Sequence, residues 1–215
     1  MAVLSRSKIL QRLRYSVGNK RSLVITPLLD ADDSLDLDSV DLRLGSHFLL
    51  PRSVQQPFFC PDRSSAASQH IPMHVPFGDY LVVPAHQTVL GSTLEFIKMP
   101  LDVCGEVLTK SSIARTFTVV ETAPWIHPGY RGCLTLEIAN VSNTPVLLYP
   151  GRKICQLILM GVDGADMTAL PNRTYFGPVY PEGPSFKNPE EDLERIGVPK
   201  NKTSILLRND STHRK

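Results

Sequence analysis

The sequence predicts a mainly β fold, a sandwich or barrel-like structure with little helix. Short apolar runs are separated by turn residues in "DYLVVPAHQTVLGSTLEFIKMP" (79–100) and again in "PVLLYPGRKICQLILMG" (145–161). This spacing is typical of all-β folds. The chain has 18 prolines and 13 glycines among 215 residues, which favours many turns and short elements over a helical bundle. Its length suits one core rather than two independent domains.

One short helix is expected near the N-terminus, where Ser5 or Ser7 can cap the first turn. The apolar residues that follow recur at helical spacing. They are Ile9, Leu10 and Leu13.

Strands are expected to follow this helix. "SLVITPLL" (22–29) predicts a strand that Pro27 closes, and "SLDLDSVDLRLGSHFLL" (34–50) alternates apolar and polar residues as a half-buried strand does. The alternation slips by one residue near Ser39, which predicts a bulge or a tight bend between two strand halves.

Two segments lack such patterns. Residues 51–78 are rich in Pro, Ser, Gln and His, and we expect a long surface excursion with little regular structure. Residues 189–215 are charged and polar, and we expect a partly disordered extension beyond a domain of residues 1–188. Within that extension "PEEDLERIG" can form one short helix.

Composition narrows the class of function. The formal net charge of +2 favours neither nucleic acid nor an anionic membrane as a partner. No stretch resembles a signal peptide or a membrane span, so we expect a cytoplasmic protein. The four cysteines form no C-x-x-C pair and are expected to be reduced thiols.

A glutamate interrupts the apolar run in "CLTLEIAN" (133–140). On a strand, Thr135 and Glu137 point to one side, while Leu134, Leu136 and Ile138 point to the other. Glu137 is therefore either an ordinary residue of a solvated face or a carboxylate directed at a ligand. Spacing alone leaves both interpretations open.

The hexapeptide "KSSIAR" (110–115) offers two hydroxyls and two cations. In a helical turn Ser111 and Arg115 share one face, and backbone N–H groups beside Lys110 can hold a phosphate. An ordinary capped turn with a solvated arginine is the alternative.

Three further features are ambiguous. "IHPGYRG" (126–132) predicts a Pro-Gly turn between two strands, with Ile126 in the core and His127 either structural or near a ligand. The amide of Gln156 can hydrogen-bond to a ligand, or Gln156 is simply a polar residue of an edge strand. The aromatic and glycine-rich segment "YFGPVYPEGP" (175–184) can fold over the flat ring of a ligand or can serve only in packing. The sequence lacks the P-loop, G-x-S-x-G and dinucleotide-binding patterns. It also lacks H-x-E paired with P-C-x-x-C, the zinc-binding pattern of nucleobase deaminases, so no protein-bound zinc is expected.

Taken in order, these motifs resemble the dCTP deaminase and trimeric dUTPase superfamily, and most closely its dCTP deaminase branch. The resemblance covers roughly residues 4–185. It includes "LSRSKIL", "SVDLRLGSHF", "GSTLEFIKMPLDVCGEVLTKSSIAR", "IHPGYRGCLTLEIAN", "PGRKICQL" and a looser "YFGPVYPEGP". It implies a distorted β-barrel or jelly roll of the dUTPase-like type, assembled as a homotrimer with active sites between subunits.

The resemblance also implies a role for each candidate residue. The catalytic group would be Glu137 as proton carrier, with Ser111 and Arg115. The substrate-binding group would be Lys110, Ser112, Ala123, His127, Thr135, Leu136, Gln156 and Tyr175. Magnesium would enter only with the triphosphate of dCTP.

Several positions depart from the family pattern, among them Lys110 and His127. Lys110 stands where arginine is usual, and His127 stands where aspartate is common. In the diphosphatase branch that aspartate resembles the group that holds the hydrolytic water. Its replacement predicts deamination of dCTP to dUTP and ammonia without further hydrolysis. A dUTP diphosphatase and a non-catalytic nucleotide-binding regulatory trimer are the alternatives on the same scaffold.

Overall fold

The computed structural model describes residues 2–52, 70–121, 123–166, 177–184 and 197. The chain divides into two units. The first comprises Met1–Pro51 and Ile71–Glu182, and the second comprises Arg52–His70 and Gly183–Lys215. All the sheet structure described below, apart from the first residue of one strand, belongs to the first unit.

The described elements are three short helices and eleven strands. The helices are α1 (Arg6–Leu13), α2 (Ala31–Ser34) and α3 (Ser111–Ala114). The strands are β1 (Val24–Thr26), β2 (Ser39–Pro51), β3 (His70–His74), β4 (Leu81–Val83), β5 (Thr88–Lys98), β6 (Val103–Thr109), β7 (Thr118–Glu121), β8 (Trp125–Ile126), β9 (Arg131–Asn140), β10 (Val146–Leu148) and β11 (Lys153–Gly161). The prediction of a mainly β fold with little helix is confirmed.

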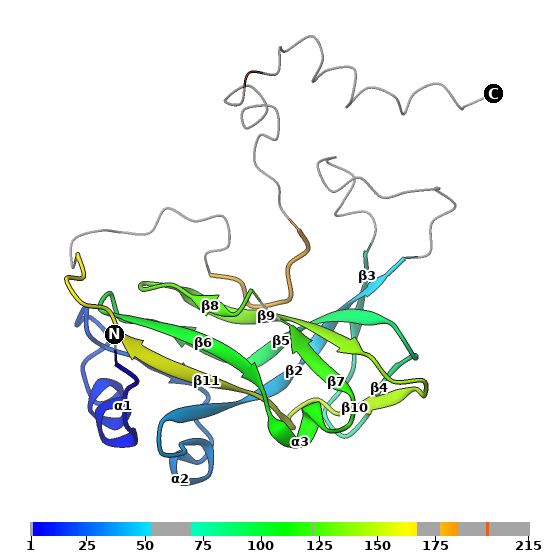
Figure 1. The fold of residues 1–215 in the computed structure, drawn as a ribbon, viewed down its shortest axis with the longest axis horizontal. Helices are drawn as coiled ribbons and strands as arrows, with labels where there is room; N and C mark the ends of the chain where they lie inside the picture. The colour runs from blue at the N-terminus through cyan, green and yellow to red at the C-terminus, as the bar shows by residue number, and fades with distance from the viewer. Residues whose placement is uncertain (1, 53–69, 122, 167–176, 185–196, 198–215) are drawn as a thin grey trace. The chain divides into compact units, whose positions relative to one another are not determined.

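Nine strands form one curled sheet. Its order is β7-β9-β5-β2-β11-β6-β8, with β1 also paired to β5 and β3 to β2. In Figure 1, β6 and β11 run together along one side of the curl, with β5 and β9 behind them. A second small sheet pairs β10 with β4. The curl is the barrel-like shape that the resemblance implied.

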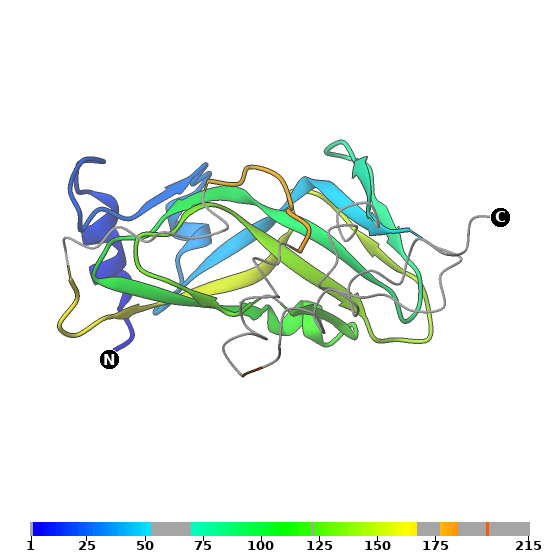
Figure 2. The same cartoon turned by 90° about the horizontal axis from the view of Figure 1, so that it is seen from above.

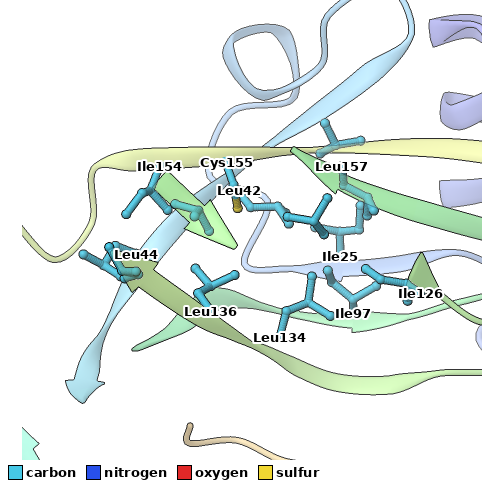
Figure 3. Packing of buried hydrophobic residues seen from close by; sticks show 14 of the residues in the cluster. Ile25, Leu42, Leu44, Ile97, Ile126, Leu134, Leu136, Ile154, Cys155 and Leu157 are labelled. Atoms are coloured by element: carbon cyan, nitrogen blue, oxygen red, sulfur yellow. The ribbon is translucent and has the colours of Figure 1, made fainter. Parts of the chain in front are cut away.

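The core fills the inside of the curl. Figure 3 shows side chains from β2, β9 and β11 converging there, and neighbouring strands complete the cluster. Its labelled members are Ile25, Leu42, Leu44, Ile97, Ile126, Leu134, Leu136, Ile154, Cys155 and Leu157. Burial of this apolar surface is the main favourable contribution to folding.

Helix α1 matches the expectation. Ser5 occupies the N-cap position in extended backbone without a side-chain capping bond, and Ile9 is fully buried. The residues before α1 join the sheet, because the Leu4 N–H donates to the Leu159 carbonyl at 2.8 Å. Figure 2 shows α1 at one end of the curl.

The slip near Ser39 is a tight bend, as predicted. The Asp36 N–H donates to the Ser39 carbonyl at 3.0 Å, and β2 begins at Ser39. The first half of the run is wrong as a strand, because residues 31–34 form α2 and Leu37 is 78% exposed. The Asp30 carboxylate accepts hydrogen bonds from two backbone N–H groups of α2, which stabilises the helical turn instead.

Strand β3 corrects the expected surface excursion, because part of residues 51–78 pairs with β2. Ile71 and Met73 alternate along it, but the strand is short and mostly exposed and Pro72 interrupts it, so its sequence pattern is weak. Residues 53–69, most of the 189–215 extension and the expected helix "PEEDLERIG" lie outside the described residues.

The described cysteines Cys104, Cys133 and Cys155 are buried thiols, as expected, and Cys60 lies outside the described residues. Burial raises the pKa of the Cys155 thiol far above its ordinary value. None of the described helices combines the length and apolar character that a membrane span needs.

Candidate active site

Glu137 lies on β9, between β5 and β7. Its Cα pairs with Leu90 on one side and with Glu121 on the other. Thr135 and Glu137 are half-buried, while the residues that alternate with them are buried in the core. The prediction that these two polar residues share the outer face is therefore confirmed. A backbone paired on both sides holds the carboxylate on a rigid support.

Leu136 points away from the face of Glu137, as the alternation predicted. Its side chain is 0% exposed and belongs to the core, as Figure 3 shows. Only its backbone could therefore border a bound base.

The "KSSIAR" segment forms a helical turn, as predicted. The Arg115 N–H donates to the Ser111 carbonyl at 3.1 Å, which places these residues four apart in a turn that follows β6. Ser111, Ser112 and Arg115 are exposed. Lys110 precedes the helix at the N-cap position.

Lys110 is engaged by a carboxylate that sequence reasoning missed. Its Nζ lies 2.5 Å from Oδ1 of Asp41, and Lys153 Nζ lies 3.2 Å from Oδ2 of the same residue. Asp41 alternates with the buried Val40 and Leu42 on β2, a pattern that places its side chain on the outer face. That alternation was visible in "SVDLRLG", but its partner Lys110, which follows β6, was not.

Gln156 lies in the interior of the sheet. Strand β11 runs between β2 and β6, and Gln156 pairs with Asp41 on one side and with Leu108 on the other. The alternative interpretation as an edge-strand polar residue is therefore wrong. Gln156 and Asp41 are half-buried neighbours, and Leu108, the β6 partner of Gln156, precedes Lys110 by two residues.

Strand β7 connects the Lys110 segment to the strand of Glu137. Thr109 Oγ1 accepts a hydrogen bond from the Val120 N–H at 2.9 Å, and Val120 pairs with Ile138. The end of β6, β7 and β9 thus lie in sequence around the curl. Lys110 and Glu137 come from positions separated by one strand.

His127 lies near the other end of β9, whereas Ala123 follows Glu121, the Cα partner of Glu137, by two residues. The Tyr130 N–H donates to the His127 carbonyl at 3.2 Å, and Gly129 has φ +75°, so the predicted Pro-Gly turn is confirmed. Ile126 is buried as expected, while Ala123 and His127 are exposed.

This turn is distant from Glu137. Glu137 follows Arg131, the first residue of β9, by six positions. A rise of about 3.3 Å per residue puts it about 20 Å along the strand from the turn. One chain therefore does not bring His127 and Glu137 together.

Residues 177–182 run along β9. The Gly177 N–H donates to the Arg131 carbonyl at 2.8 Å, and the Glu182 N–H donates to Thr135 Oγ1 at 3.1 Å. Between them the Cys133 N–H donates to the Pro178 carbonyl at 2.7 Å. This part of "YFGPVYPEGP" packs against the sheet, and Tyr175 lies outside the described residues.

Across the described ranges, no group of three or more His, Cys, Asp or Glu side chains is arranged to hold a metal ion. The expectation that magnesium enters with the triphosphate stays a prediction.

Comparison with known proteins identifies the family. The family model described as "dCTP deaminase-like" matches residues 3–162. The chain belongs to this family. The resemblance recognised in the sequence is thus confirmed, including its dCTP deaminase branch.

Two curated relatives are the "dCTP deaminase, dUMP-forming" proteins of two organisms. The one from Methanobrevibacter smithii is 34% identical over 160 residues, covering 74% of this chain and 79% of the relative. The one from Methanothermobacter thermautotrophicus is 32% identical over 208 residues, covering 96% and 94%. Both names give dUMP as the product, whereas the sequence predicts dUTP.

The fold is also similar to a solved structure. The 2'-deoxycytidine 5'-triphosphate deaminase from Agrobacterium tumefaciens superimposes with a TM-score of 0.55 at 22% identity, covering 73% of this chain and 47% of that one. At this identity the likeness supports the fold alone.

Proposed function

We propose that this protein deaminates dCTP by hydrolysis. The observation that carries the proposal is Glu137, a half-buried carboxylate on a strand that is paired on both sides. The name of a relative that aligns with 96% of the chain supports dCTP as the substrate.

Deamination needs water at C4 of the cytosine, a proton at the ring nitrogen and a proton on the departing ammonia. One fixed carboxylate can accept the proton from water and deliver protons in the later steps. We assign this role to Glu137, with Ser111 and the carbonyl of Ala123 holding the water and Arg115 beside the sugar and base. The balanced reaction is dCTP and water giving dUTP and ammonia.

We assign binding of the triphosphate to the residues around Lys110. Lys110 and Ser112 lie at the start of α3, and Gln156 is on the adjacent strand β11. Tyr175 completes the set by resemblance, and magnesium accompanies the triphosphate as a counterion. Thr135 and the backbone of Leu136 border the base.

We further propose that the active unit is a homotrimer with sites between subunits. Within one chain His127 lies at the far end of β9 from Glu137, and β7 separates Glu137 from the start of α3. A neighbouring copy that supplies one of these groups would complete the site.

A second function, formation of dUMP, is favoured by the names of the relatives. It would require a second water to cleave the triphosphate and release diphosphate. His127, in place of the aspartate common in the family, favours release of dUTP instead.

Incubation of the purified protein with dCTP, followed by chromatography and an ammonia assay, tests these proposals. Ammonia released in equal amount to dUTP is expected from the residues of this chain. Ammonia with dUMP and diphosphate would assign the chain the activity in its relatives' names. Parallel incubation with dUTP alone identifies a diphosphatase, and no product from either nucleotide would overturn the proposal.

A further inference from the structure

Asp41 connects two lysines on the outer face of the sheet. Its Oδ1 lies 2.5 Å from Lys110 Nζ, and its Oδ2 lies 3.2 Å from Lys153 Nζ. The Asp41 side chain is only 12% exposed, and both lysine side chains are 25% exposed. Each oxygen of this carboxylate therefore engages a different cation in a partly buried setting, where ion pairs are screened less by salt.

Lys153 has no donor left for a ligand. An ammonium group has three N–H donors. Lys153 Nζ contacts three acceptors, which are the Asp33 carbonyl at 2.6 Å, Asp33 Oδ1 at 2.8 Å and Asp41 Oδ2 at 3.2 Å. Burial lowers the pKa of Lys153, but its hydrogen bonds to Asp33 and Asp41 outweigh this and raise it. Lys153 is thus a charged anchor that fixes the Asp41 carboxylate.

Lys110 is placed differently. Among the described residues its ammonium group has one acceptor, Asp41 Oδ1, so two of its three donors are open to a ligand. The lysine stem is flexible and loses conformational freedom when it binds a phosphate. A partner that already holds the ammonium in place reduces that loss.

We propose that Asp41, anchored by Lys153, is a positioning residue that presents Lys110 to the triphosphate of the substrate. This inference rests on the proposed function, because it takes Lys110 as a triphosphate ligand. It adds two residues, Asp41 and Lys153, which act through Lys110 and do not contact the substrate themselves. Gln156, the Cα partner of Asp41 on β11, lies beside the same carboxylate.

The test compares Asp41→Asn with Asp102→Asn. Asp102 is a matched control, because it is a 16% exposed carboxylate shared by two cations, Arg12 at 2.8 Å and Arg21 at 3.7 Å. We expect Asp41→Asn to raise KM for dCTP by about tenfold with kcat within about twofold of the parent, since one charged hydrogen bond is affected. Asp102→Asn should leave both constants unchanged, and Asp41→Glu should recover part of the KM.

A double-mutant cycle separates positioning from general structural damage. In a Lys110→Ala background, Asp41→Asn should cause no further rise in KM, because its effect passes through Lys110. A further rise of about tenfold, or a fall in KM for the single Asp41→Asn variant, would overturn the inference.

Calorimetric titration with dCTP distinguishes the two proposals. If the parent binds dCTP without deaminating it, the proposed function is wrong, and the same variants test the inference through Kd. If the parent deaminates dCTP and Asp41→Asn has the parent's KM, the inference alone is wrong. A parent that neither binds nor converts dCTP contradicts both.

Discussion

Thr109 and Val120 join the two sides of the curled sheet through a side chain. Thr109 Oγ1 accepts from the Val120 N–H at 2.9 Å and donates to the Val120 carbonyl at 3.2 Å. Hydrogen bonds from a side chain to the backbone thereby link β6 to β7 in place of backbone pairing. Lys110 follows Thr109 directly, and Val120 pairs with Ile138, the residue after Glu137. This contact therefore sets the spacing between Lys110 and Glu137.

Replacing Thr109 by valine should lower the free energy of unfolding by about 1–3 kcal/mol, because the N–H and carbonyl of Val120 lose their partner. Thr109→Ser keeps the hydroxyl and is the control. Urea unfolding followed by circular dichroism measures both variants. Equal stability of Thr109→Val and the parent would show that the hydroxyl does not hold the sheet together.

Glu137→Gln should abolish most of the deaminase activity while preserving the fold. The amide keeps the shape of the side chain but cannot accept the proton from water, and general acid–base catalysis supplies about 10²–10⁴-fold. We therefore expect kcat to fall by at least that factor, with dCTP binding retained. Glu106→Gln, the same change at a half-buried position on β6, should retain the parent's kcat. A Glu137→Gln variant with near-normal kcat would remove Glu137 from the mechanism.

Lys110→Ala should act on binding rather than on chemistry. Because Lys110 is assigned to the phosphates, KM for dCTP should rise more than kcat falls. Steady-state kinetics with dCTP checks this, and Lys8→Ala on the exposed face of α1 is the control. An unchanged KM would place the triphosphate elsewhere on the protein.

Activity should persist in a zinc-selective chelator and respond to magnesium. Zinc sites in proteins need several Cys, His or carboxylate ligands, and the catalytic residues proposed here include a single carboxylate. Magnesium is expected to bind the triphosphate and reduce its charge. Activity that is lost on zinc chelation and regained only with zinc would contradict this mechanism.

His47 should make stability depend on pH. Its ring centroid lies 4.7 Å from that of His74 and 4.3 Å from that of Tyr180. Burial, with a smaller contribution from His74, lowers the pKa of His47 below its ordinary value of 6.5. Above that value the residue is neutral in both states, so its contribution to stability is fully present.

As the pH falls below 6.5, the unfolded chain binds a proton at His47 before the folded chain does, and the free energy of unfolding decreases until the lowered pKa is passed. Denaturant unfolding between about pH 8 and about pH 5 measures this decrease. His47→Phe should show a smaller decrease than the parent. The same pH dependence in both proteins would assign the effect to other groups.

The sequence by itself determined the local elements of this protein. Alternation in "CLTLEIAN" predicted the face that carries Glu137, and "KSSIAR" and "IHPGYRG" predicted the helical turn and the Pro-Gly turn. These features depend on side-chain period and on turn chemistry, which act between residues close together in the chain.

Only the tertiary structure decided which of these elements meet. Asp41 contacts Lys110 across 69 positions of sequence, and Gln156 lies inside the sheet because β2 and β6 flank β11. Strand β3 forms through backbone pairing with β2, although Pro72 interrupts its short apolar alternation. Strand order and ion-pair partners follow from the packing of the whole curled sheet. Side-chain period along a strand reveals which face a residue occupies but carries no information about its neighbour on the next strand.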